Sequence, residues 1–151
     1  MSMMSSIDFK LSEKHCKAID RLGVIESIIE SGWKCREHDG IHYLPLGDQG
    51  EFDWQIEDIS FEQLFEILRQ KQECNELIGM TLLWENTDVG VILLFHADGT
   101  LSFSTNINRV ALDAECSGRK LTDMNWYLER LAPAIHNAGY SVEFISFNLY
   151  L

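Results

Sequence analysis

Apolar residues recur at intervals of three and four in three segments of the chain, and this spacing predicts three helices, each with one buried face. The apolar positions are Leu22, Ile25, Ile28 and Ile29 in the first segment, Phe61, Leu64, Phe65 and Leu68 in the second, and Tyr127, Leu128, Leu131 and Ile135 in the third. Residues able to cap or end a helix flank these segments: Ser12 and Gly32, Ser60, and Thr122 or Asp123 with Gly139. We therefore expect the first element of the fold to be a helix that Ser12 caps.

The other apolar runs predict strands. Residues 33–46 contain the two-residue turn signal Asp39-Gly40 between short aromatic and aliphatic runs, which is typical of a β-hairpin. Four further strands are expected, at residues 76–85, 89–96, 100–107 and 140–151. The segment from Val89 to Phe95 is apolar on both faces, so we expect it inside the sheet.

The expected elements follow in the order helix, hairpin, helix, three-stranded meander, helix and final strand. This order predicts an α+β fold in which helices pack on a largely antiparallel sheet. A chain of 151 residues with 46% hydrophobic residues is expected to form one domain, residues 1–151, with its own core. It has no apolar run near the ~20 residues of a membrane span and no signal-peptide pattern, so we expect a soluble cytoplasmic protein.

Charge is unevenly distributed along the chain. The formal net charge is −12, and residues 47–76 alone carry nine acidic and two basic residues, a net charge of −7. Such a field repels nucleic acid and an anionic membrane surface, and it attracts a basic partner. We therefore expect no direct binding to nucleic acid or to membranes.

The stretch GEFDWQIEDISFEQLFE, residues 50–66, is the most acidic part of this segment. Acidic and apolar residues alternate from Glu51 to Ile56, which in an extended strand would place carboxylates on one side and apolar groups on the other. From Ser60 onward the acids fit the wet face of an ordinary amphipathic helix. We predict a partner-binding surface with Trp54 as an aromatic anchor, formed by Asp48, Glu51, Asp53, Trp54, Glu57, Asp58, Glu62 and Glu66. A solvated acidic face without a partner is the alternative interpretation.

The sequence predicts no catalytic residues, metal site or cofactor. It contains none of the GxSxG, Walker, GxGxxG or HExxH motifs. His38 and His42 flank the Asp39-Gly40 turn and could form a zinc-like set with Cys35, although two exposed hairpin histidines are the simpler interpretation. The four cysteines show no CxxC spacing and are expected to be reduced structural thiols: Cys16, Cys35, Cys74 and Cys116.

A second polar region lies at expected strand ends. Residues 84–90 and 106–109 are rich in Asn, Thr and Asp, which make turns but can also form a polar recognition rim. Arg109 is expected either to join this rim or to pair with an acid inside the protein.

Two stretches resemble small bacterial immunity proteins that are encoded beside polymorphic toxins, including those of contact-dependent growth inhibition systems. They are ELIGMTLLWENTDVGVILLF and LTDMNWYLERLAPAIHNAGYSVEFISF, about a third of the chain together. The resemblance implies a cytoplasmic, non-enzymatic inhibitor that binds one cognate basic toxin domain, expected to be a nuclease. It supplies no site residues, so the candidate surface rests on charge alone.

Two alternatives remain beside this hypothesis. One is a small hydrolase that uses carboxylates or the two hairpin histidines, for which a pocket with convergent polar groups would be expected. The other is a general regulatory interaction module without a toxin partner.

Overall fold

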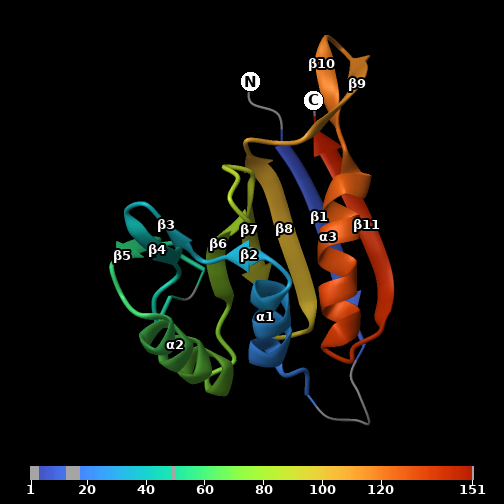
Figure 1. Cartoon of the computed structure of the whole chain (residues 1–151). Helices are drawn as coiled ribbons and strands as arrows, with labels where there is room; N and C mark the ends of the chain where they lie inside the picture. Colours follow the sequence, from blue (N-terminus) through green and yellow to red (C-terminus); the bar gives the residue numbers. More distant parts are fainter. Residues whose placement is uncertain (1–3, 13–17, 49, 151) are drawn as a thin grey trace.

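The computed structural model describes residues 4–12, 18–48 and 50–150 (Figure 1). It confirms the α+β class: helices pack against one large antiparallel sheet. The helices are α1 (Arg21–Glu30), α2 (Phe61–Glu73) and α3 (Met124–Asn137). The strands are β1 (Met4–Leu11), β2 (Trp33–Lys34), β3 (Arg36–Glu37), β4 (Gly40–Tyr43), β5 (Gln55–Glu57), β6 (Ile78–Trp84), β7 (Gly90–Phe95), β8 (Thr100–Ile107), β9 (Ala111–Cys116), β10 (Arg119–Thr122) and β11 (Val142–Tyr150).

Nine of the described strands form one sheet, with the main order β11-β1-β8-β7-β6-β4-β3. The short strand β2 pairs with β6, and β5 pairs with β4, so this end of the sheet consists of short strands. Figure 1 shows β3, β4 and β5 at the end opposite to β11, with α2 at the same end, while β2 lies above α1. All pairings between the described strands are antiparallel.

The prediction that the first element is a helix capped by Ser12 is wrong. The first element among the described residues is β1, and the first helix described is α1, which starts at Arg21 with Asp20 at its N-cap position. β1 lies inside the sheet between β8 and β11, and its buried residues alternate from Ser5 to Leu11. The alternation of Ile7, Phe9 and Leu11 with polar residues is the pattern of a half-buried strand, which the sequence analysis missed. Pairing with β8 and β11 stabilises this strand.

The sequence analysis also missed the two-stranded sheet of β9 and β10, which Figure 1 shows extending beyond the main sheet. Every residue of β9 is exposed, so the segment has no buried face to produce an alternating apolar pattern. The turn between the strands places Ser117 and Gly118 at φ values of 52° and 75°, as a type I′ hairpin turn requires.

The helix boundaries at α2 and α3 match the predicted caps. Ser60 accepts a hydrogen bond from the Gln63 amide at 3.1 Å, and the Gln63 side chain accepts one from the Ser60 amide at 2.8 Å. This capping box satisfies two amide groups that a helix start otherwise leaves unpaired. Asp123 caps α3 through the Trp126 amide, while Thr122 is buried and bonds to Ser5 instead.

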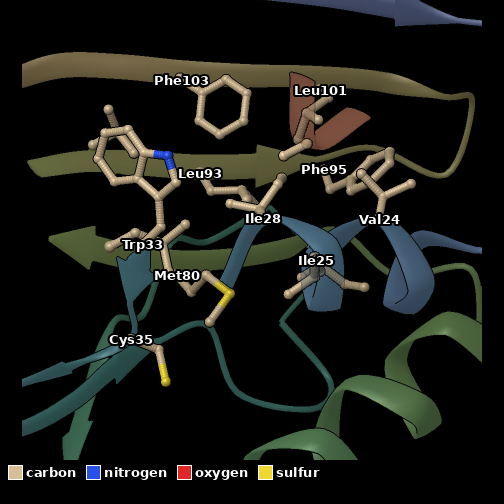
Figure 2. Packing of buried hydrophobic residues seen from close by; sticks show 14 of the residues in the cluster. Val24, Ile25, Ile28, Trp33, Cys35, Met80, Leu93, Phe95, Leu101 and Phe103 are labelled. Atoms are coloured by element: carbon tan, nitrogen blue, oxygen red, sulfur yellow. The ribbon is translucent and has the colours of Figure 1, made fainter. Parts of the chain in front are cut away.

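Buried side chains form one core between the sheet and the helices. In Figure 2, Val24 and Ile28 of α1 extend toward residues of β7 and β8 such as Phe95 and Leu101. The prediction that the apolar segment ending at Phe95 lies inside the sheet is confirmed, because β7 pairs with β6 on one side and β8 on the other.

The C-terminal strand β11 forms one end of the sheet. β11 pairs only with β1 among the described strands, and it exposes Phe144, Phe147 and Tyr150. None of the described helices is long and apolar enough to span a membrane.

Candidate partner-binding surface

The acidic segment forms the end of the sheet opposite to β11. A loop from Leu44 to Trp54 leads into β5, and α2 follows after three residues. Figure 1 shows β5 and α2 next to each other at this end. We call the exposed side chains of residues 51–66 the acidic surface. The geometry of the loop decides which of these side chains face solvent.

Asp48 organises the loop from inside. Asp48 is only 6% exposed, and its carboxylate accepts four backbone hydrogen bonds. The donors are the amides of Gly50, Glu51 and Phe52 to Oδ1, at 3.1, 3.1 and 3.2 Å, and the amide of Asp53 to Oδ2, at 2.8 Å. The assignment of Asp48 to the contact surface is therefore corrected: its charge holds the loop and does not face a partner.

The same hydrogen bonds, with that of the Asp53 amide foremost, hold the pKa of the Asp48 carboxyl below its usual range, although burial opposes them. A lowered folded-state pKa stabilises the loop above the unfolded-state pKa, about 3.9, and this contribution is lost as the pH falls through the folded-state pKa. We expect hydrogen-exchange protection of amides 50–53 to persist at pH 4 and to disappear in stronger acid.

Measured by NMR, Asp48→Asn should lack this protection at every pH, because an amide group cannot offer two charged acceptor oxygens. A wild-type carboxyl that titrates near 3.9, or full protection in the Asn variant, would contradict this role for Asp48.

The loop turns Phe52 outward in a conformation that is unfavourable for a bulky residue. Its φ is 55°, in the left-handed region, and Phe52 is 48% exposed. The expected alternation of buried apolar and exposed acidic residues does not hold here. Ile56 is also exposed, at 53%, while the Trp54 ring lies against Gly79 of β6.

A buried ion pair holds the base of this loop. Lys71 of α2 has no exposed surface, and its Nζ donates to the carbonyl of Pro45 at 2.7 Å and to Glu76 Oε1 at 3.2 Å. The same Glu76 oxygen accepts the Gly47 amide at 2.8 Å. The ammonium group and the carboxylate therefore join α2, the loop and the start of β6.

The predicted acids differ in how far their charge is neutralised. Asp58 pairs with Arg36 at 2.7 Å, and Glu66 pairs with Arg69. Four exposed acids have no ion-pair partner among the described residues: Glu51, Asp53, Glu57 and Glu62. Glu57 lies beside Tyr43, whose hydroxyl pKa is raised by burial and further by this carboxylate. The negative charge of the surface is therefore concentrated on these four side chains.

An apolar pocket adjoins the acidic surface. It has a volume of about 430 Å³ and is lined by Ile29, Lys34, Cys35, Arg36, Ile41 and Phe61. Phe61 is 40% exposed and belongs to both the pocket and the start of α2. The sequence analysis placed Phe61 on the buried face of α2 from its spacing and did not foresee the pocket, which combines residues of α1, β2, β4 and α2.

The predicted polar rim comes together in space. Asn108 donates to the carbonyl of Asp88 at 2.8 Å, and both residues line a groove of about 340 Å³ that also includes Glu37 and His38. Arg109 instead turns inward and donates to the Thr122 hydroxyl at 2.9 Å, so its internal partner is not an acid.

The zinc-like set of Cys35, His38 and His42, which the sequence analysis gave as the less simple interpretation of the hairpin, does not form. Cys35 is buried in the core, and the ligand atoms that converge in the described residues are those of Glu37, Asp39 and His42. A hydrogen bond from His42 is the main reason that the pKa of Asp39 is lowered. The other predicted cysteines and histidines take no part in this cluster, and Cys16 lies outside the described residues.

We compared the chain with protein-family models, with curated proteins and with solved structures, and none of the three comparisons gave a match.

Proposed function

We propose that the protein is an immunity protein that binds a cognate basic toxin domain through the acidic surface and thereby neutralises it. The observation that carries the proposal is the arrangement of residues 51–62. Phe52, Ile56 and Phe61 expose apolar surface among four carboxylates that have no described ion-pair partner. Interfaces combine buried aromatic anchors with charged groups that guide association in this way.

The conformation of Phe52 supports a role in binding. A bulky residue with a positive φ destabilises the folded state by about 1–3 kcal/mol, and an exposed ring offsets little of this destabilisation. A partner that covers the ring would offset it by burying apolar surface. The four hydrogen bonds to Asp48 hold the loop in this conformation before any partner arrives, which lowers the entropic cost of binding.

Direct occlusion of a nuclease active site is the mode of inhibition that we favour. A nuclease binds polyanionic substrate through basic groups, and a surface dense in carboxylates presents the same charge. Because like charges repel, the acidic surface would not itself bind nucleic acid. The apolar pocket beside Phe61 would accept one apolar side chain of the toxin and contribute to specificity.

The test is to sequence the region around the gene and to express this chain together with the product of any long reading frame found beside it. We expect the neighbouring protein to end in a basic domain that arrests growth, to co-purify with this chain and to be neutralised by it. A non-cognate toxin domain of the same class is the control and should not be neutralised. A regulatory module without a toxin would give neither arrest nor rescue, and that result would overturn the proposal.

The hydrolase alternative remains a prediction. The cluster of Glu37, Asp39 and His42 has the residue types that such an enzyme would use. The proposed binding through the acidic surface does not depend on this cluster.

A further inference from the structure

The β3–β4 hairpin brings three metal-ligating side chains to one point. His42 Nε2 lies 2.8 Å from Asp39 Oδ1 and 2.9 Å from Glu37 Oε2. The three ligand atoms all lie within 4.8 Å of one another. They come from both strands of the hairpin and from its turn, so the topology of the hairpin itself assembles the cluster.

Hydrogen bonds alone satisfy this cluster incompletely. A single imidazole nitrogen carries at most one proton, which can be directed at only one of two carboxylate oxygens at a time. Glu37 Oε2 is buried and has no hydrogen bond of acceptable geometry, although His42 Nε2 is its neighbour. A buried carboxylate oxygen without a donor is unfavourable. A cation bound between His42 Nε2 and the carboxylate oxygens of Glu37 and Asp39, in place of the imidazole proton, would contact all three ligand atoms together.

The distances suit an ion of the size of Zn²⁺. Zinc bonds to imidazole nitrogen and carboxylate oxygen are about 2.0–2.2 Å long, so two ligand atoms on one tetrahedral ion lie roughly 3.3–3.6 Å apart. The observed separations of 2.8 and 2.9 Å are roughly 0.4–0.8 Å shorter. Small side-chain rotations would therefore open the cluster to the required size.

The backbone that carries the ligands is held in place. Gly40, the first residue of β4, has a φ of 125°, and a Cβ at this position would lie 2.5 Å from the carbonyl oxygen of Glu57. Only glycine allows this close approach of β5, and β5 in turn pairs with β4. The site is also accessible from one side, because the Asp39 side chain is 60% exposed and water there could complete the coordination.

We propose that Glu37, Asp39 and His42 form a binding site for a divalent transition-metal ion, through one imidazole nitrogen and two carboxylate oxygens. This mixed set of nitrogen and oxygen ligands suits Zn²⁺ and Mn²⁺ better than Ca²⁺ or Mg²⁺, which prefer oxygen alone. The proposal is independent of the toxin partner.

The test is a titration of the full chain with ZnCl₂, followed by calorimetry and by the ¹⁵N resonances of the imidazole rings. We expect one equivalent of Zn²⁺ to shift the His42 Nε2 resonance while the rings of His96 and His136 stay unchanged. The ring resonance separates this site from zinc bound to thiols. The thermal midpoint of the wild-type protein should rise with zinc.

Glu37→Gln and Asp39→Asn keep the shape of each side chain and should each weaken zinc binding by at least about tenfold. His38→Ala, on the same hairpin, is the matched control and should bind as the wild type does. A His42 ring that does not respond to zinc would overturn the proposal. Equal weakening by His38→Ala, or unchanged affinity in both carboxylate variants, would overturn it as well.

Discussion

Reversing Glu51, Asp53, Glu57 and Glu62 to Lys is expected to slow association with the cognate toxin domain by about 10- to 1000-fold at low salt. These carboxylates are exposed and have no ion-pair partner among the described residues, so their field extends into solvent. Long-range attraction acts mainly on the association rate, whereas buried contacts set the dissociation rate. Stopped-flow measurements between about 20 and 500 mM salt would give both the rate and its salt dependence, which should flatten in the variant.

A second set of four reversals separates steering by this surface from a change in net charge. Glu26, Glu30, Glu129 and Glu143 are exposed and lie on α1, α3 and β11. Reversing them changes the net charge of the protein by the same amount but leaves the acidic surface intact. We expect this control to keep most of the association rate. Equal slowing by the two sets would remove the acidic surface from the proposed interface, although the immunity function would stand.

Replacing Lys71 with alanine is expected to cost about 3–5 kcal/mol of unfolding free energy, because it leaves the carboxylate of Glu76 largely buried without its cation. The carbonyl of Pro45 also loses its donor. Urea denaturation followed by circular dichroism would measure the effect. Loosening of the loop should accompany it, so that exchange of amides 50–53 becomes faster.

Two variants serve as controls for Lys71. Arg69→Ala removes an exposed ion pair with Glu66 on the same helix and should cost less than about 1 kcal/mol. The double replacement Lys71→Met with Glu76→Gln removes both charges and should be less destabilised than Lys71→Ala. If Lys71→Ala costs no more than Arg69→Ala, the buried pair does not hold the loop.

The acidic surface could be predicted from the sequence only in part. The concentration of charge was visible, and six of the eight predicted residues are exposed acids. Asp48 could not be separated from them, because its carboxylate has the same formal charge whether solvent or four amides surround it. The loop sequence offers one signal in retrospect. Gly47 and Gly50 flank Asp48, and both have positive φ values, as a tight loop around an acidic side chain requires.

The side-chain pattern alone determined the cap at Ser60, the interior position of β7 and the helical faces apart from Phe61, which is exposed. Each of these is a local property, because helix and strand periodicity fix which residues share a face. The pattern left Thr122 and Asp123 as alternatives at the start of α3. Tertiary structure decided the rest. β1 took its place inside the sheet by pairing with β8 and β11, which follow it in sequence by roughly 90 to 146 residues. Phe52 was turned outward by Asp48, and Glu37, Asp39 and His42 met because a hairpin closed. Burial and pairing depend on contacts between distant segments, which the local order of apolar and polar residues does not specify.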